Sequence, residues 1–245
     1  MSSTFTKLIR GSTPAAELHG GAHHDATGKR ERRKEARPGE LLEAALDLFV
    51  EKGFAATRAE EVAARAGVSK GTLFLYFPSK EELFKAVVRE NISGRFREWN
   101  DEFTAFEGST ADLVRFCMKT WWDRVGATRA SGITKLIISE ARNFPDIAAF
   151  YHDEVIKPGN DLMRRILQRG VDRGEFQVAD MDYAIFGLTA PMVFLIMMKH
   201  SLGACAPKDF PLDPERYIAS QADLLINGLL VRADTPKKST GSRKS

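Results

Sequence analysis

The residues of this chain whose types and spacing could do chemistry stand together between Ala66 and Leu83, in the stretch AGVSKGTLFLYFPSKEEL. Ser69 can cap a helix at its start, and Pro78 ends it. The bulky side chains from Leu73 to Phe77 go all the way round the helix axis, whereas a helix that serves one core keeps its large side chains on one stripe. One part of this short helix therefore packs against the protein, and another part is available to a partner.

The chemistry that this arrangement offers is contact with DNA. A capping box of Thr57 and Glu60 predicts a preceding short helix that ends at Gly67. Two short helices across a tight turn are typical of a helix-turn-helix, in which the second helix enters the major groove. We therefore expect Leu73 to pack inward, and the side chains that face DNA to be Lys70, Thr72, Leu75 and Tyr76.

Phosphate contacts are expected beside these residues. Gly71 has no Cβ, so its backbone can approach a phosphate or a base edge closely. Ser69 and Thr57 stand at predicted helix N-termini, where N–H groups and the helix dipole favour phosphate oxygens. Arg58 and Lys80 are basic residues that flank the motif. The alternative is that all these side chains are simply the surface of a helical domain.

The elements that must position the motif are predicted to be helices. Apolar residues at helical spacing begin near Pro38, and Gly53 is a natural C-terminal stop. Ser79 with Glu82 opens a long helix to about Glu107. The later helices are predicted over residues 110–126, 131–143, 145–172 with a kink at Pro158, 180–201 and 213–231. The chain is thus predicted to be all-α, with about nine helices.

The same stretch also carries a family resemblance. The motifs at the relevant spacing are Gly53-Phe54, Thr57, Val62-Ala63, Gly67-Val68-Ser69, Gly71-Thr72-Leu73, Tyr76-Phe77 and Ser79-Lys80-Glu81. With them, residues 38 to about 85 resemble the DNA-binding domain of the tetracycline-repressor (TetR/AcrR) family of bacterial regulators. Arg58 and Leu75 depart from the family's usual residues, which bears on the operator sequence rather than on the family.

The resemblance implies roles for individual residues and a second domain. Lys70, Thr72 and Leu75 would read or touch bases, and the phosphate contacts would come from Thr57, Ser69, Tyr76 and Lys80. The family also carries a variable C-terminal helical domain that dimerises and binds a small ligand. It implies a homodimer on a pseudo-palindromic double-stranded DNA operator, released when a small-molecule effector binds.

The C-terminal residues give independent hints of that domain. The helix from Tyr183 to Met198 is apolar almost all round, as a helix buried on several sides must be. A membrane span is the rival interpretation, but the apolar run is shorter than about 20 residues and contains Pro191. Paired with the apolar stripe of the last helix, two such helices from each chain would make a four-helix dimer interface.

A ligand pocket is predicted among the aromatic residues of this region. Glu140 falls on an inward stripe of its helix, and a buried carboxylate needs a partner. That partner is either a ligand or an internal arginine such as Arg164 or Arg165. Core packing is the alternative role for each aromatic residue. The candidate pocket residues are Phe116, Trp121, Glu140, Phe144, Tyr151, Met163 and Phe186, which suit an apolar or aromatic effector.

Charge divides the chain into four expected parts. The net charge of +3 combines basic ends with residues 38–85, which hold six basic and eight acidic side chains, a poor balance for a DNA-binding surface. We expect a disordered basic arm, which either lies along DNA or only solubilises the protein. The expected parts are the arm (1–36), the helix-turn-helix domain (37–85), the effector-binding and dimerisation domain (86–232) and a disordered basic tail (233–245).

Other function classes find little support in the sequence. It contains no dinucleotide fingerprint, phosphate loop or Gly-x-Ser-x-Gly motif, and no carboxylates paired with a positioned histidine. We therefore expect a ligand-responsive transcriptional repressor in the cytoplasm, bound to the nucleoid when on DNA, without cofactor, metal, membrane or enzymatic activity. The alternatives are an architectural or effector-free DNA-binding protein and, less favoured, a helical enzyme.

Overall fold

The computed structural model describes residues 26–206 and 212–231, with side chains from Pro38 onward. The chain divides into two units, residues 1–37 and 38–245. The expected basic tail lies outside the described residues, as does the expected arm up to residue 25. The expected boundary near residue 85 falls within a continuous helix of the second unit.

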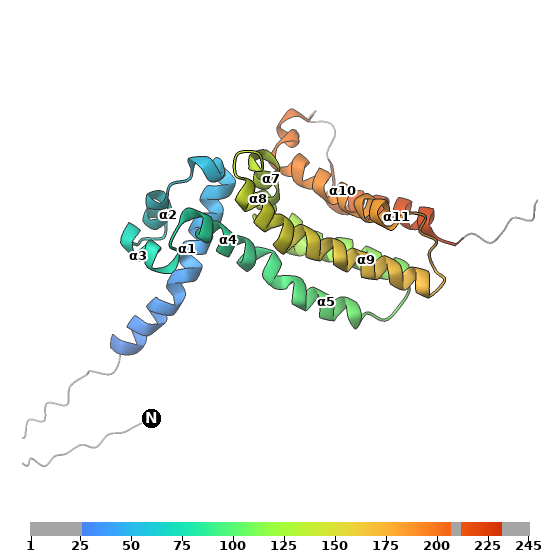
Figure 1. The fold of residues 1–245 in the computed structure, drawn as a ribbon, viewed down its shortest axis with the longest axis horizontal. Coiled ribbons are helices and arrows are strands. Elements are labelled where there is room, and N and C mark those ends of the chain that lie inside the picture. The colour runs from blue at the N-terminus through green and yellow to red at the C-terminus, as the bar shows by residue number, and fades with distance from the viewer. Residues whose placement is uncertain (1–25, 207–211, 232–245) are drawn as a thin grey trace, which may run out of the picture. The chain divides into compact units, whose positions relative to one another are not determined.

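The DNA-binding motif occupies the first four helices (Figure 1). They are α1 (Ala26–Ala56), α2 (Ala59–Arg65), α3 (Lys70–Tyr76) and α4 (Lys80–Asn91). The expectation of disorder up to residue 36 is wrong for residues 26–36, which belong to α1. That segment is rich in Lys, Arg, Glu and Ala, which are strong helix formers, and Pro38 does not end the helix.

The core of these helices is aromatic. Gly53 interrupts α1 with a φ of 85°, a conformation that glycine adopts without strain. The break directs Phe54 back toward Phe49, and both rings meet Phe84 of α4, with centroids 5.4 to 5.7 Å apart. Leu73 of α3 is fully buried in the same cluster. This packing holds the short α3 although it has only two turns of its own.

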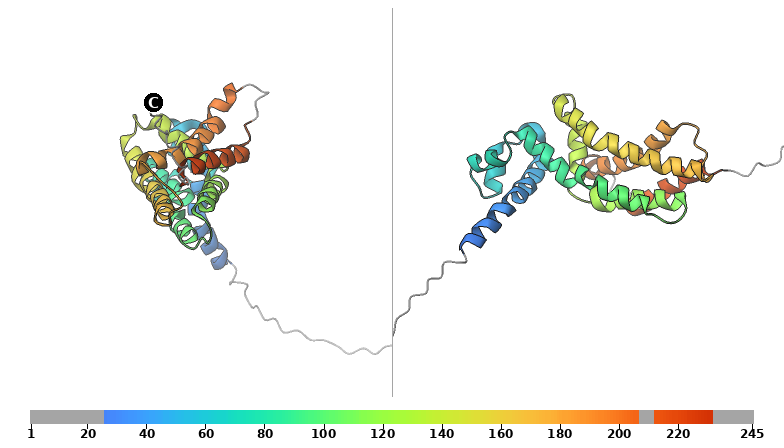
Figure 2. Two further views of the ribbon diagram at one scale, coloured as in Figure 1. Left: turned by 90° about the vertical axis from the view of Figure 1, so that its right-hand side faces the viewer. Right: turned by 60° about the horizontal axis from the view of Figure 1, so that its bottom comes forward.

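The remaining helices form the rest of the second unit. They are α5 (Phe96–Thr104), α6 (Thr110–Trp121), α7 (Ser131–Glu140), α8 (Pro145–Tyr151), α9 (Lys157–Asp172), α10 (Met181–His200) and α11 (Pro214–Leu229). Helices α6, α9, α10 and α11 pack on one another, and α5 packs on α9 (Figures 1 and 2).

Short turns of other helix types join several of these segments. The 3-10 turn Ser93–Arg95 joins α4 to α5, and the 3-10 turn Leu202–Cys205 follows α10. The π-helical turn Trp122–Gly126 extends α6, and a second π-helical turn, His152–Ile156, joins α8 to α9. Within the described ranges, eleven α-helical segments therefore form the nine runs that the sequence predicts, because two long runs are each divided.

Helix α10 has 20 residues and is apolar enough to cross a membrane by length and composition, a test that core helices of soluble proteins also pass. The sequence argument that the apolar run is too short to span a membrane is therefore wrong. In the structure α10 packs against α7, α9 and α11, and Ile185, Leu195 and Ile196 are buried in the core. Only 28% of its most apolar stretch is buried, so one face of α10 packs in the core and the rest of the helix stays at least partly exposed.

Candidate DNA interface and ligand pocket

Helix α3 is held by its cap and by one buried side chain. The Ser69 hydroxyl accepts a hydrogen bond from the Thr72 backbone N–H at 3.1 Å, as predicted for the cap. The Ser69 and Thr72 hydroxyls also lie 2.9 Å apart. Leu73 is fully buried, so the rotation of α3 about its axis is fixed. Ser69 and Thr72 are therefore oriented by the helix start before any DNA is present.

The opposite face of α3 is open to solvent. Leu75 is 85% exposed, and Lys70 and Gly71 are also exposed. A Cβ at Gly71 would meet no heavy atom nearer than the Ser69 hydroxyl at 3.7 Å, so the exposed surface is unobstructed there. Tyr76 is half-buried at the end of this face. An exposed leucine on a two-turn helix needs a partner to cover it, and the structure brings Lys70, Gly71 and Leu75 together on one surface.

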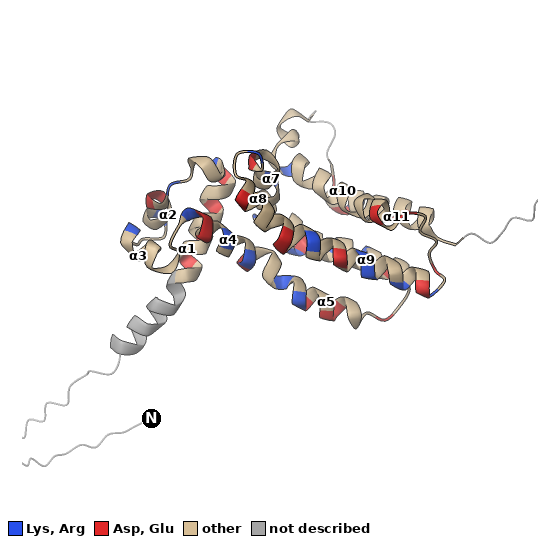
Figure 3. Ribbon diagram, in the orientation of Figure 1, with Lys and Arg blue, Asp and Glu red and all other residues tan. Residues whose placement is uncertain are grey.

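Basic and acidic residues both occur around α3 (Figure 3), and several of them form ion pairs. Lys70 lies 2.5 Å from the Glu60 carboxylate, and this hydrogen bond holds the pKa of Glu60 below its usual value. Arg65 pairs with Glu51 in the same way. Arg58 is exposed at the start of α2 and forms no ion pair with any described residue. Most of the positive charge near α3 is thus already shared with carboxylates, as the sequence balance suggests.

Two expected phosphate contacts are wrong. Thr57 is only 1% exposed, and its hydroxyl donates to the Leu48 and Gly53 carbonyls, so it braces the break in α1. The expected capping box also moves by one residue, because Arg58 is the N-cap of α2. A threonine that follows a helix stop can cap the next helix or satisfy the carbonyls of the last one, and its spacing to Glu60 does not distinguish the two.

Lys80 is the second correction. Its ammonium group donates to the carbonyls of Phe54, Ala55 and Thr57 at 2.8 to 3.3 Å, and it lies 4.4 Å from the centroid of the Phe54 ring. An ammonium group has three donors, and here all three are directed into the protein. Lys80 therefore ties the start of α4 to the end of α1 instead of binding a phosphate.

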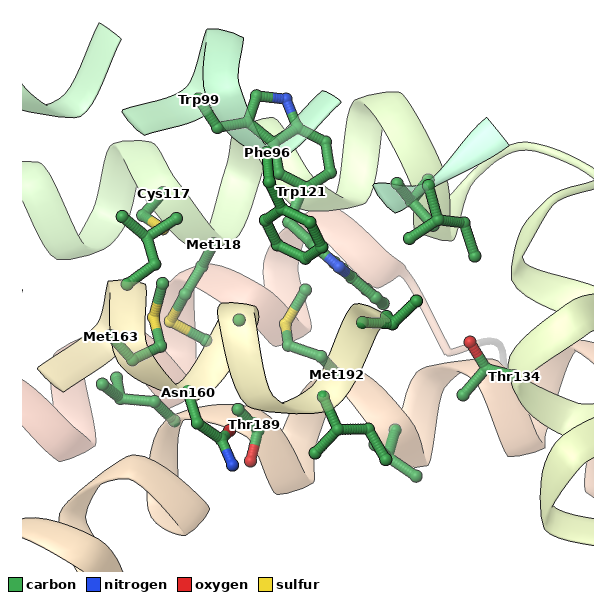
Figure 4. Close-up of a pocket in the computed structure, with 18 of the residues that line it drawn as sticks. Phe96, Trp99, Cys117, Met118, Trp121, Thr134, Asn160, Met163, Thr189 and Met192 are labelled. Atoms are coloured by element: carbon green, nitrogen blue, oxygen red, sulfur yellow. The ribbon is translucent and has the colours of Figure 1, made fainter. Parts of the chain in front are cut away.

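A cavity of about 380 Å³ lies among the helices of the C-terminal part (Figure 4). This volume is typical of sites for small molecules. Its walls come from the end of α4 and from α5, α6, α7, α8, α9 and α10, together with both π-helical turns. The side chains labelled around it in Figure 4 are Phe96, Trp99, Cys117, Met118, Trp121, Thr134, Asn160, Met163, Thr189 and Met192.

The titratable side chains that line the cavity are neutral at physiological pH. The Tyr151 hydroxyl lies 2.8 Å from that of Thr134, and burial raises the pKa of Tyr151 to about 12. Burial likewise raises the pKa of the Cys117 thiol. Among the described residues that form the cavity wall, none is a lysine, arginine, histidine, aspartate or glutamate.

The structure brings four of the seven predicted pocket residues into this cavity wall: Trp121, Tyr151, Met163 and Phe186. The prediction that Phe116 lines the pocket is wrong, because its ring packs on the outside of α6 against Phe103 and Phe106. The same prediction for Phe144 is also wrong, because the centroid of its ring lies 4.8 Å from that of Phe54, which belongs to α1. Phe116 lies on a predicted apolar face and Phe144 lies between two predicted helices, and an apolar side chain at either kind of position can be covered from more than one side.

Glu140 is not a pocket residue either. It is half-buried at the end of α7, where it accepts a hydrogen bond from the Asn143 amide and lies close to Gly53. The expected internal pair is wrong as well, since Arg164 pairs with Asp182 and Arg165 donates to Asn100. Ala141 and Asn143 follow at the end of α7, so Glu140 has access to water that a mid-helix position would deny it.

Sequence reasoning missed the aromatic wall on α5. Phe96, Trp99 and Phe103 stand at i, i+3 and i+7, which is one face of a helix. That spacing is a signal that could have identified them. Met118 and Met192 were missed too, and their types carry no signal that separates a pocket from a core.

The cavity and the DNA-binding helices are connected by packed residues within the second unit. Ile92, at the end of α4, lines the cavity. Lys80, at the start of α4, donates a hydrogen bond to the Phe54 carbonyl of α1. Arg129, just before α7, pairs with Glu43 and Asp47 of α1. Gly132 of α7 packs against Val50 so closely that a Cβ there would lie 2.6 Å from it.

A second surface, on α10 and α11, is apolar and exposed. Tyr183 and Phe186 of α10 are 74% and 56% exposed, and Leu224 of α11 is 64% exposed. Exposed apolar side chains gathered on adjacent helices are typical of protein interfaces. For metals, no group of three or more His, Cys, Asp or Glu side chains that could hold an ion occurs in the described part of the chain.

Comparison with known proteins agrees with this architecture. Residues 41–87 match the family model "Bacterial regulatory proteins, tetR family", and residues 107–204 match "Tetracyclin repressor-like, C-terminal domain". The HTH-type transcriptional regulator RutR of Escherichia coli (strain K12) is 53% identical over 64 residues, which are 26% of this chain and 30% of that protein. The chain thus spans about a third of the length of this relative.

Longer alignments are more distant. The HTH-type transcriptional repressor KstR2 of Rhodococcus jostii (strain RHA1) is 27% identical over 159 residues, 64% of this chain and 74% of that protein. The structure of the regulator FadR from Bacillus subtilis in complex with stearoyl-CoA superposes with a TM-score of 0.61 at 20% identity, covering 77% of this chain and 97% of that one. The two family models, which together match more than half of the chain, and the shared fold show that the chain belongs to the tetracycline-repressor (TetR) family of bacterial regulatory proteins.

Proposed function

We propose that this protein is a transcriptional repressor that binds a DNA operator as a homodimer and is released by a small apolar effector. The observation that carries the proposal is the single helix α4. It holds the DNA-binding helices through Lys80 at one end and lines the cavity through Ile92 at the other. A change in the cavity therefore has a direct mechanical route to α3, without any catalytic step.

The operator contacts follow from the exposed face of α3. Lys70, Thr72 and Leu75 are the side chains for the major groove, where Leu75 can cover a thymine methyl group. Ser69, Gly71, Tyr76 and Arg58 are the candidates for phosphates, which position a protein without reading sequence. To reach DNA, Lys70 has to leave Glu60, so an ion pair within the protein is exchanged for one between Lys70 and DNA.

The dimer is proposed to form through the exposed apolar surface of α10 and α11. Two copies would bury Tyr183, Phe186 and Leu224 together, and each dimer would then present two α3 helices to a pseudo-palindromic operator. The same burial would explain an apolar α10 in a protein that works in the cytoplasm.

Release from DNA requires that the effector prefer a conformation in which the two α3 helices of the dimer no longer match the two halves of the operator. An effector that binds this conformation more tightly by about 1 to 3 kcal/mol weakens operator binding roughly 5- to 150-fold. The cavity also weighs against an effector-free architectural protein, because such a protein needs no 380 Å³ space in its C-terminal core.

The test is operator selection followed by substitution. We would select binding sites from random double-stranded DNA, then compare the wild type with Lys70→Ala and Thr72→Ala on the selected site and on unrelated DNA. Each variant is expected to lose on the order of 1 to 3 kcal/mol on the selected site and much less on unrelated DNA. Lys119→Ala, an exposed change on α6, is the control. Equal losses on both DNAs would mean that these residues contact phosphates instead of reading bases. Failure to select any site would refute sequence-specific DNA recognition.

A further inference from the structure

The cavity carries chemical information about its ligand that the family does not supply. Its wall is uncharged among the described residues, and its aromatic and methionine side chains present an apolar surface. A charged group placed inside would lose its hydration and find no opposite charge, which costs far more than burying a neutral polar group. The wall therefore selects against ions of either sign.

The charges on the surrounding helices are directed elsewhere. Arg89 and Glu154 pair at 3.0 Å, and Arg124 pairs with Glu102 at 3.0 Å. Arg164 on α9 is held by Asp182. Arg124 Nη1 and Glu102 Oε2 have no hydrogen-bond partner among the described residues, but neither side chain lines the cavity, so the neighbouring helices do not compensate for the uncharged wall.

Several polar side chains in the wall still offer hydrogen bonds, including the buried Trp99 indole N–H, which has no partner among the described residues. The Thr134 and Tyr151 hydroxyls, 2.8 Å apart, carry one hydrogen each, and only one of these can lie between the two oxygens. The second hydrogen is left to donate to a ligand. The Asn160 amide lines the cavity and forms no hydrogen bond with any other described residue. Figure 4 shows Thr134 well separated from Asn160.

We propose that the ligand of this cavity is an uncharged molecule with an apolar body, an oxygen acceptor at the Thr134–Tyr151 pair and a second polar group at Asn160. This deepens the proposed function and rests on it. Anionic acids and primary ammonium compounds are excluded from the interior, and a neutral amide, ester, ketone or alcohol is accepted.

The experiment compares matched probes that differ in charge: decanamide, decanoate and decylammonium. Binding to the full-length protein is measured by calorimetry and by the fluorescence of Trp99 and Trp121, which both line the cavity. At pH 7.5 decanamide is expected to bind about 100-fold more tightly than decanoate or more, because a carboxyl group with a pKa near 4 is almost wholly ionised there. Decylammonium is expected to bind as weakly as decanoate.

A pH series sharpens this expectation. Only the protonated acid fits the wall, so the affinity for decanoate should fall about tenfold for each pH unit between 6 and 8, while that for decanamide stays constant. The described cavity wall contributes no titration of its own here, because burial keeps both Cys117 and Tyr151 protonated across this range. Equal affinities for amide and acid, or no binding of decanamide, would overturn the proposal.

A substitution then tests the site within the cavity. Asn160→Lys places a cation in the wall and should tighten decanoate about tenfold or more, since a nearby opposite charge shifts a carboxyl pKa by a unit or more. Gln168→Lys makes the same change of charge at an exposed position of α9 and should have no effect. An equal gain in both variants would mean that decanoate binds outside the cavity.

Operator binding measured with the same probes separates this proposal from the proposed function. If decanamide binds as expected but leaves DNA affinity unchanged, the chemistry of the cavity stands and ligand-controlled release fails. If decanoate binds as tightly as decanamide and also releases DNA, ligand control stands and the inference about charge fails.

Discussion

The helices of the proposed DNA interface and the helices around the cavity solve opposite packing problems. Around α3 the core is filled, with Phe49, Phe54 and Phe84 in mutual contact and Leu73 fully buried beside them. In the C-terminal part, a cavity of about 380 Å³ remains among flexible methionines such as Met118 and Met192. The first region is packed to hold one surface in place, and the second keeps space that a molecule can fill.

The two regions differ in charge as well. Cations near α3 are paired with carboxylates at the surface, as Lys70 is with Glu60, whereas the cavity wall carries no charged residue in the part of the chain described. DNA recognition can thus be modulated by exchanging ion partners in water. Ligand recognition depends on burial, where an ion would be costly. The difference teaches that each region's polarity follows from its partner, and four changes test it.

The largest effect is expected inside α3. Leu73→Ala removes a fully buried side chain and should lower the free energy of unfolding by about 2 to 5 kcal/mol. Leu75→Ala, two residues away and 85% exposed, should change it by no more than about 0.5 kcal/mol while weakening operator binding. Urea denaturation and DNA titration of both variants check this. A stable Leu75→Ala protein with unchanged operator affinity would show that this face does not meet DNA.

The second effect concerns the contact between α7 and α1. Gly132→Ala drives a Cβ to within 2.6 Å of Val50 and should cost about 1 to 3 kcal/mol of stability through overpacking. Gly39→Ala, in α1, meets no atom within 4 Å and should instead stabilise the helix by about 0.5 to 1 kcal/mol. Thermal melting of the pair measures both. Opposite signs support close packing of α7 on α1, and equal signs contradict it.

A smaller effect is expected from the ion pair beside α3. Glu60→Gln frees Lys70 and removes a negative charge near the proposed phosphate path, so DNA affinity should rise severalfold. Glu81→Gln makes the same change of charge at an exposed position of α4 and should raise affinity less. Titrations at several salt concentrations measure the difference, and a larger gain for Glu81→Gln would place the DNA elsewhere.

The smallest effect is a pH dependence at the end of α10. His200 lies 2.8 Å from the Ser131 hydroxyl, and its pKa is lowered by burial and by Lys199 and Lys135. The folded protein therefore binds a proton less readily than the unfolded chain, so stability falls as pH drops below about 6.5. His200→Gln should flatten the melting temperature between pH 7 and pH 5, and exposed His152→Gln should not. The same slope in all three proteins would contradict this role for His200.

The DNA-binding helices could be predicted from the sequence because their signals are local. Caps such as Ser69 and Ser79, the stop at Gly53 and the turn before α3 all act over a few residues, and the structure places each at a helix end. Thr57 and Lys80 could not be assigned in the same way. Their partners are backbone carbonyls that become available only once α1 has broken and α4 has docked against it.

The cavity could be predicted only in part because its wall is a product of tertiary packing. Trp121 and Tyr151 lie in helices that the apolar pattern identifies, but Phe116, on such a helix, and Phe144, between two predicted helices, were also selected and pack elsewhere. Amphipathic spacing tells which face is buried and not what buries it. The space between these helices and turns depends on how far apart they settle, and no short motif encodes that distance.

The two π-helical turns beside the cavity have a consequence for how such a site can change in evolution. A π-helical turn arises when an α-helix accommodates one additional residue, and deleting that residue restores the regular helix. Because the wide turn takes up the additional residue locally, a single deletion in 122–126 or 152–156 would change which side chains of the turn face the cavity and leave the rest of the helix in register. Relatives could thus acquire a different ligand through a change in length alone, with the identities of the remaining wall residues unaltered.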